Sequence, residues 1–164
     1  MTTPPGRSAA DGDATSPTAL ALVAGLVDLA TIVATVDLER VLADLGRPAR
    51  DAARAVDDPL LGAAVVLVDD PTAGRLAVAE PTTEGRLAAT LARHGEGPCG
   101  RYLSIPEPAT SDVLDAFRRR ATVDGVAISR VETGPFGPSV LVLSGPVTGP
   151  HLIVAGFRPL PSGS

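Results

Sequence analysis

Hydrophobic positions along the chain change period several times, and each change predicts a new element. Residues 29–36 form an apolar run with Ile, Val and Thr, which favours a buried strand. In residues 37–45 the Leu and Val side chains recur at the three- and four-residue spacing of a helix, with Asp37 as N-cap and Gly46 at the other end. A strand followed by an amphipathic helix is therefore expected at 29–45.

Two further strands and a second helix complete the first half. Residues 60–68 and 75–80 are apolar runs joined by the turn sequence DDPTAG. An indistinct stretch that ends at Asp58 is consistent with a weak edge strand. Residues 83–94 then place Leu87 and Leu91 on one helical face.

The second half repeats this order. Residues 100–105 predict a strand, and residues 111–120 predict a helix with Val113, Leu114 and Phe117 on one face. Three further strands are expected at 126–131, 139–144 and 151–157. Strand, helix and three strands thus occur twice, and neither repeat could bury its sheet face alone. We therefore expect one pseudo-symmetric α+β unit.

The domain boundaries follow from this pattern. Residues 1–18 are polar, Pro/Gly-rich and without periodicity, which predicts a disordered tail. A single domain is expected over 19–158, with repeat one at about 27–81, a linking helix at 83–94 and repeat two at about 99–157. Residues 159–164 are a second tail.

The apolar stretch Ala19–Val36 raises the alternative of a membrane span or an export signal. A span would carry Asp28 at its centre, at a cost of about 2.5–3.5 kcal/mol. The stretch also lacks flanking Lys or Arg, and the upstream segment is too acidic for a signal peptide. We expect a lead-in followed by a strand, in a cytoplasmic protein.

Composition narrows the possible functions. The 164 residues are 45% hydrophobic and 20% charged, as in globular domains. All 14 basic residues are Arg, they are scattered, and the net charge is −5, which argues against a nucleic-acid partner. A single Cys excludes an internal disulfide and a Cys-cluster zinc site.

The order of elements resembles the vicinal oxygen chelate superfamily, which includes glyoxalase I, methylmalonyl-CoA epimerase, extradiol dioxygenases and bleomycin-resistance proteins. Residues 76–105 are similar to the epimerase-like branch: a strand ends in Glu80-Pro81, a helix follows, and Gly-Glu-Gly at 95–97 leads into the next strand. Residues 134–156 resemble the closing hairpin of the family. The resemblance covers roughly residues 26–158 and implies a cupped mixed β-sheet.

The same resemblance implies four metal ligands, one in the first and one in the last strand of each repeat. They align with Leu29, Ala77, Gly100 (or Cys99, if the register shifts by one) and Val154. None of the four aligned residues offers the imidazole or carboxylate that a divalent metal needs, and only the shifted register would offer a thiol. The chain therefore resembles a degenerate, metal-free member of the superfamily, with no cofactor expected.

Strand alternation from those positions predicts which side chains line the cup. Tyr102, Ser104 and Thr31 are the candidate catalytic hydroxyls, with Tyr102 donating to a substrate carbonyl or enolate. Arg130 is a candidate anchor for a carboxylate or an acyl-thioester phosphate. The remaining candidate ligand-binding residues are small or aliphatic: Leu29, Val33, Ala77, Ala79, Gly100, Leu152 and Val154.

Three functions stay open on this evidence. The first is a metal-independent isomerase, epimerase or cyclase of specialised metabolism that acts on an apolar aliphatic or polyketide-like small molecule. The second is a non-catalytic binder that sequesters a small molecule such as an antibiotic. The third is a scaffold without a ligand, in which Tyr102 merely packs. A homodimer is expected because an open sheet edge needs cover, and neither nucleic acid nor a membrane is expected as a partner.

Overall fold

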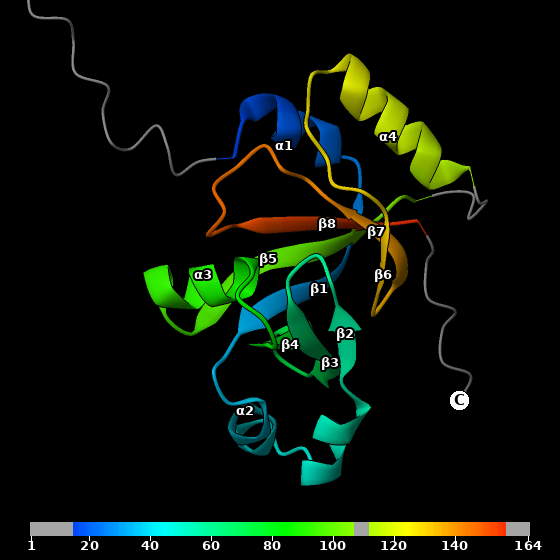
Figure 1. Cartoon of the computed structure of the whole chain (residues 1–164). Helices are drawn as coiled ribbons and strands as arrows, with labels where there is room; N and C mark the ends of the chain where they lie inside the picture. The colour runs from blue at the N-terminus through cyan, green and yellow to red at the C-terminus, as the bar shows by residue number, and fades with distance from the viewer. Residues whose placement is uncertain (1–14, 107–111, 157–164) are drawn as a thin grey trace, which may run out of the picture.

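The computed structural model describes residues 15–106 and 112–156 (Figure 1). Most of the two predicted tails therefore lies outside the described residues. The elements, in chain order, are α1 Pro17–Val23, β1 Val27–Ala34, α2 Leu38–Asp44, the 3-10 helix η2 Ala49–Arg54, β2 Val56–Asp58, β3 Ala63–Asp70, β4 Gly74–Pro81, α3 Arg86–His94, β5 Gly97–Ser104, α4 Val113–Val123, β6 Glu132–Gly134, β7 Gly137–Leu141 and β8 His151–Ala155.

The strands form one mixed sheet in the order β2-β3-β4-β1-β5-β8-β7-β6. The predicted tandem order is confirmed, because each repeat is a strand, a helix and three strands, and its first strand pairs in parallel with its last: β1 with β4 and β5 with β8. The antiparallel pair β1–β5 joins the repeats at the centre of the sheet. The fold is therefore α+β with two half-sheets and one linking helix, α3.

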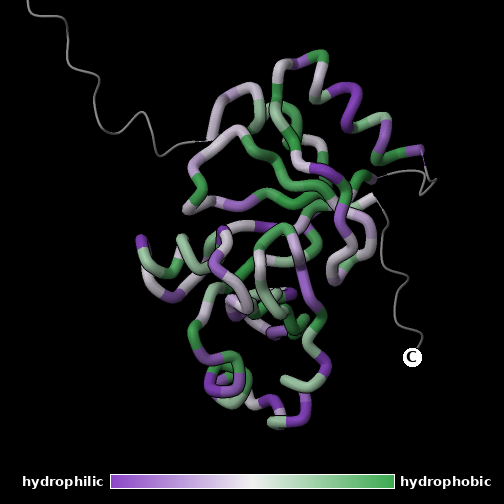
Figure 2. The backbone as a smooth tube through the Cα atoms, viewed as in Figure 1, coloured by the Kyte–Doolittle hydropathy of each residue, from purple (hydrophilic) through white to green (hydrophobic). Residues whose placement is uncertain are grey.

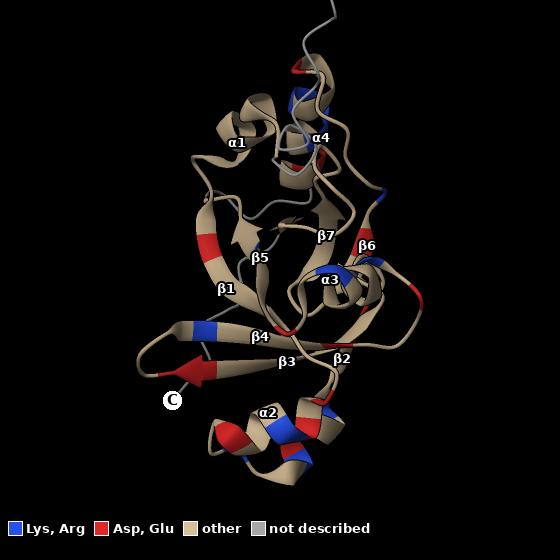
Figure 3. Ribbon diagram, turned by 90° about the vertical axis from the view of Figure 1, so that its left-hand side faces the viewer, with Lys and Arg blue, Asp and Glu red and all other residues tan. Residues whose placement is uncertain are grey.

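The sheet curls until its two edge strands, β2 and β6, contact each other. Its outer face carries α2 against repeat one, and α1 with α4 against repeat two. Figure 3 shows α1 and α4 at one end of the molecule and α2 at the other. The uncovered edge that led us to expect a homodimer is thus covered within the chain, and the dimer stays a prediction.

The inner face of the curled sheet is packed with the chain's own side chains. Six alanines, Ile32, Val65, Tyr102, Leu141 and Ile153 form one buried cluster there, into which Leu61, Leu87 and Phe136 also pack. Figure 2 shows the hydrophobic residues concentrated along these central strands, and hydrophilic residues along α2 and α4. We call this inner, filled space the cup.

Local sequence explains where the helices begin. The Asp37 side chain accepts the backbone N–H of Arg40 at 3.0 Å, so Asp37 is the N-cap of α2, as predicted. Ser16 caps α1 in the same way, and Pro17 occupies its first turn. The predicted lead-in to the first strand is therefore a helix, and it begins at Pro17, inside the last residues of the predicted tail.

The strand predicted at 126–131 is also wrong. Only Ile128 makes an isolated bridge, to Val142, and the third strand of the second repeat is β6 at Glu132–Gly134. The Ser129 hydroxyl accepts the N–H of Leu141 at 2.8 Å and so replaces a ladder bond between two main chains. Gly137 has a φ of 85°, which the turn between β6 and β7 requires. This turn pairs β6 with β7, so the strand begins only after the irregular segment.

Within the described residues, no helix combines the length and the apolar character that crossing a membrane requires.

Candidate functional site

The side chains that share the cup with Tyr102 follow from the strand registers. Tyr102 lies beside Ala30 on β1 and Ile153 on β8, and Ile32 lies beside Ala77 on β4. Side chains on opposite residues of neighbouring strands share a face. From β1, therefore, Ala30, Ile32 and Ala34 face the cup.

The predicted lining of β1 is wrong for two of its three residues. Thr31 and Val33 lie on the other face, so Thr31 is not a partner of Tyr102. Leu29, which lies at a register irregularity of the ladder, packs against the cup cluster. The β1–β5 ladder has register irregularities on both sides of Ala30–Ile32, which strict alternation counted from an aligned position does not anticipate.

The last strand is likewise shifted. Leu152 and Val154 face outward and belong to the cluster under α1 and α4, whereas His151, Ile153 and Ala155 face the cup. Ala77, Ala79, Gly100, Tyr102 and Ser104 lie on the cup face, where alternation put them. The Ser104 hydroxyl donates to the carbonyl of Ile105 at 3.2 Å, so its proton is used locally.

Arg130 does not reach the cup. Its side chain is 86% exposed and is bound to Glu132 by an ion pair of 2.6 Å. Arg101 and Asp28, at 3.2 Å, form a second surface pair on the outer face of the central strands. The anchor role proposed for Arg130 from the sequence therefore has no support in its position.

The polar centre of the cup is a pair of side chains, one from each repeat. The Tyr102 hydroxyl donates a short hydrogen bond to Asp58 Oδ2, and both residues are buried. The other carboxylate oxygen of Asp58 accepts the N–H of Leu60 at 2.9 Å. A hydrogen bond thus joins Asp58 at the end of β2 to Tyr102 on β5 across the interior of the curled sheet.

Sequence reasoning missed Asp58. It lies in a stretch with weak periodicity, beside a second aspartate, Asp57, that faces out. The one available signal is that Asp58 precedes Pro59 and Leu60, the setting of an Asx turn, in which the carboxylate accepts a backbone N–H two residues on. That signal marks a turn and does not show that the carboxylate is buried.

Burial sets the protonation of this pair. Removal from water raises the pKa of the Asp58 carboxyl, and Glu132 adds to the rise, although the bonds from Tyr102 and Leu60 oppose it. Burial and the neighbouring Asp58 charge raise the pKa of Tyr102 well above its usual value. The phenol therefore keeps its proton at neutral pH and donates it in a hydrogen bond to a carboxyl group whose pKa is raised.

The β6–β7 hairpin covers this pair. Phe136, in the turn between the two strands, packs into the cup with its ring centroid 5.1 Å from that of Tyr102. At Gly134 a Cβ atom would lie 3.3 Å from the Asp58 carboxylate, so only hydrogen at this position leaves room without a shift. The hairpin therefore covers the cup with its backbone at Gly134 and fills part of the cup with the Phe136 ring.

A second polar contact lies at the opposite end of the cup. His151 Nε2 and the Thr90 hydroxyl are 2.7 Å apart, and both residues are buried. Burial, with a smaller contribution from Arg86, lowers the pKa of His151 to about 4, so the imidazole is neutral at pH 7. Burial also raises the pKa of the Cys99 thiol to about 11, which leaves it protonated and a poor nucleophile.

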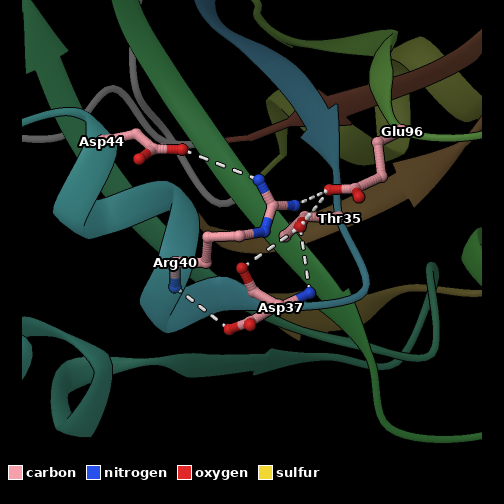
Figure 4. A network of polar contacts seen from close by, with 5 residues as sticks. All are labelled: Thr35, Asp37, Arg40, Asp44 and Glu96. Carbon is pink, nitrogen blue, oxygen red and sulfur yellow. Dashed lines mark hydrogen bonds and ion pairs between the residues drawn. The ribbon is translucent and has the colours of Figure 1, made fainter.

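The network in Figure 4 ties the end of β1 to the start of β5 outside the cup. The Thr35 hydroxyl donates to Glu96 Oε2 at 2.6 Å, and Arg40 donates to the same oxygen at 2.5 Å. The bond from Thr35 lowers the pKa of the Glu96 carboxyl, with a contribution from Arg40. Because the contacts of Glu96 are to groups within the chain, we interpret the network as structural.

The residues in the cup do not fit a metal ion. Across 15–106 and 112–156, no three His, Cys, Asp or Glu side chains lie close enough together to hold one. At Gly100, one of the positions that the family resemblance assigns to a ligand, a Cβ would overlap the backbone of His151. This backbone leaves no room there for a ligating side chain.

Comparison with known proteins places the fold. No protein-family model matches the chain, and no curated protein does. A hypothetical protein from Bacillus halodurans is similar in structure, with a TM-score of 0.59 and 13% identity over 84% of this chain and 99% of that one. Methylmalonyl-CoA epimerase from Mycobacterium tuberculosis has a TM-score of 0.52 and 20% identity, over 82% of this chain and 89% of that one.

A variant methylmalonyl-CoA epimerase from Streptomyces coelicolor, in complex with 2-nitronate-propionyl-CoA, has a TM-score of 0.50 and 18% identity over 83% of this chain and 99% of that one. At these identities the likeness shows the fold alone. The chain has the vicinal oxygen chelate fold.

Proposed function

We propose that this protein is a metal-independent enzyme of the isomerase type, which moves a proton beside the carbonyl of an apolar aliphatic small molecule. The observation that carries the proposal is the buried pair of Asp58 and Tyr102: a basic carboxylate and a protonated phenol held together in a cup lined mainly by apolar side chains. Pairs of ionisable groups whose environments shift their pKa values are typical of catalytic sites.

The pair supplies both groups that such a reaction needs. Asp58 takes a proton from the carbon beside the carbonyl, and the C–H electron pair forms the C=C bond of an enolate. The Tyr102 hydroxyl donates a hydrogen bond to the enolate oxygen, where the negative charge develops. The enolate then turns its other face to Asp58, and return of the proton to the same carbon restores the carboxylate and leaves the epimer. In a conjugated substrate, return of the proton to the far carbon of the dienolate leaves a positional isomer.

The electrostatics favour this assignment of roles. The pKa of Asp58 is raised toward neutral pH, and a carboxylate with a higher pKa is a stronger base. The rise in the Tyr102 pKa keeps the phenol a donor throughout the physiological range. Both shifts have burial as their first cause, so they depend on water being kept out of the cup.

A substrate reaches the pair when the β6–β7 hairpin moves. β6 is an edge strand, held to β7 by three residue pairs, and its contact with β2 is not a strand pairing. A shift of this hairpin withdraws Phe136 from beside Tyr102 and leaves a ring-sized space lined by small side chains. Short loops and edge elements of this kind open on microsecond to millisecond timescales.

Non-catalytic binding is the second candidate, and one observation favours it: the Phe136 ring already fills the cup as a hydrophobic ligand would. A binder would use Tyr102 as one hydrogen-bond donor and would have no use for the basic carboxylate. A homodimer, a cytoplasmic location and an origin in specialised metabolism belong to both candidates as proposals.

Exchange of hydrogen for deuterium tests the catalytic proposal without knowledge of the natural product. The protein is incubated with octan-2-one in D₂O, and deuterium on the carbons beside the carbonyl is followed by mass spectrometry. Tyr102→Phe should slow enzyme-dependent exchange by roughly 10²–10³, since one donor to a developing oxyanion is lost. Asp58→Asn should abolish it, because the amide is not a base.

Thr122→Val is the matched control, since it removes an exposed hydroxyl that bonds within α4, and it should exchange like the wild type. A wild type that binds octan-2-one without exchanging hydrogen would establish the binder instead. In a binder, Tyr102→Phe should weaken affinity by only about 0.5–1.5 kcal/mol.

A further inference from the structure

A small pocket lies where β2 begins, at the edge of the sheet. It has a volume of 220 Å³ and is bounded by the segment before β2, by β3 and by the β6–β7 turn. Its lining is Arg47, Asp51, Arg54, Val56, Val65, Val66, Leu67 and Pro135. The pocket thus combines two guanidinium groups with a hydrocarbon wall.

The pocket lies beside the strand that carries Asp58. Val56 and Asp58 alternate along β2 and therefore face the same side, opposite Val65 and Ala63 on β3. Pro135 on the far wall is the neighbour of Phe136, the residue that plugs the cup. A molecule seated here contacts the turn that must move for the cup to open.

The charges in the pocket fit one carboxylate. Arg47 lies 3.8 Å from Asp51, so that guanidinium is partly balanced. Arg54 has no ion-pair or hydrogen-bond partner among the described residues. Two Arg and one Asp leave a single positive charge, which matches a monoanionic carboxylate better than a dianionic phosphate, and the planar guanidinium pairs with a carboxylate in a bidentate manner.

We propose that this pocket binds the carboxylate of an aliphatic keto acid, with Arg54 as the principal anchor and Val56, Val65 and Leu67 against the hydrocarbon chain. The inference rests on the proposed function, because it places the carbonyl of the same molecule at Tyr102. It deepens that function by naming a substrate class: an acid whose carbonyl lies some distance along the chain from its carboxylate.

The strand geometry sets that distance. Asp58 lies two residues beyond Val56, which corresponds to about 6.6 Å along the strand. A hydrocarbon chain needs roughly five to six C–C bonds to cover this distance, and six bonds separate the carboxyl carbon of 7-oxooctanoate from its carbonyl carbon. 7-Oxooctanoate has a suitable separation, and octan-2-one is its neutral counterpart, with a methyl group in place of the carboxylate.

The experiment measures binding of both probes by calorimetry and their deuterium exchange as above, in the wild type, Arg54→Met and Arg50→Met. Arg50 lies in the same 3-10 helix and outside the pocket lining, so its variant is the matched control. Arg54→Met should weaken binding of 7-oxooctanoate by roughly 10- to 100-fold, the loss expected for one charged hydrogen-bonded pair. Binding of octan-2-one should not change, and Arg50→Met should affect neither probe.

The outcomes separate this inference from the function on which it rests. If both probes exchange hydrogen and Arg54→Met alters neither, the carboxylate pocket is overturned while the proton transfer stands. If 7-oxooctanoate binds in an Arg54-dependent manner but never exchanges, the pocket stands and the enzymatic function falls. Failure of the wild type to bind 7-oxooctanoate at about 1 mM overturns the inference.

Discussion

The two repeats have the same order of elements but different interiors. In repeat one the cup face of β1, β3 and β4 is hydrocarbon, mostly alanine with Ile32 and Val65, and Asp58 at the end of β2 is the one buried charged residue of this repeat. Repeat two puts Tyr102, Ser104, Ser139 and His151 on the same inner face. Corresponding pairs show the contrast: Ile32 lies beside Ala77 in repeat one, and Tyr102 lies beside Ile153 in repeat two.

The difference teaches how one fold can carry a site that is not symmetric. Two similar half-sheets make a common wall, and each then contributes a different partner: a base at the end of β2 and a donor in the middle of β5. The pair exists only when both repeats are folded against each other. The Asp58–Tyr102 pair therefore depends on the contact between the edge strands β2 and β6, which forms because the two similar half-sheets curl into one closed sheet.

The largest expected effect concerns the backbone junction in repeat two. Gly100→Ala should destabilise the protein by more than about 4 kcal/mol, because the added Cβ would overlap the main chain of His151 and force β5 and β8 apart. Chemical denaturation measures the loss.

Gly25→Ala is the matched control, since a Cβ there meets nothing within 4 Å, and it should change stability little. Equal stability of the two variants would show that repeat two has no such close approach and that the contrast between the interiors is overstated.

The next effect concerns acid stability. His151 has a pKa lowered from 6.5 to about 4, so the folded state resists protonation that the unfolded chain accepts. The stability that this provides is complete above pH 6.5 and is lost as the pH falls to about 4, a change of about 3 kcal/mol. Asp58 works in the opposite sense, since its raised pKa favours folding as the pH falls toward 3.8.

Thermal unfolding between pH 7 and 4 checks this balance. The wild type should lose stability across the range, and His151→Gln should lose less, because glutamine does not titrate. An identical pH profile for both proteins would place the acid sensitivity elsewhere than in the interior of repeat two.

The smallest effect is expected where the two repeats meet on the surface. Arg101 and Asp28 pair across the β1–β5 junction, but both are about half exposed. Arg101→Met should change stability by less than about 1 kcal/mol, and less again in high salt. A larger loss in a denaturation experiment would mean that the junction depends on surface charge and not on the buried cup.

The architecture was predictable because it rests on periodicity. The tandem order of strand and helix follows from apolar spacing, and Asp37 as a helix cap follows from its side-chain chemistry. Three features were not predictable. The irregular β1–β5 ladder places Thr31 on the outer face. The Ser129 hydroxyl takes the place of one main-chain acceptor opposite Leu141. The burial of Asp58 depends on the contact of its carboxyl group with Tyr102 across the closed sheet. All three are set by contacts between segments far apart in the chain.

The emission of Tyr102 tests the central claim most directly, because the protein has one Tyr and no Trp. A phenol that shares its proton with a carboxylate emits weakly, so wild-type emission should be low at pH 7 and rise with acid, at a midpoint above 3.8, as Asp58 is protonated. Asp58→Asn should emit strongly, without this transition, at pH values where circular dichroism shows both proteins folded. The same emission and the same pH profile in Asp58→Asn and the wild type would contradict the account, since Asp58 and Tyr102 would then not be a pair.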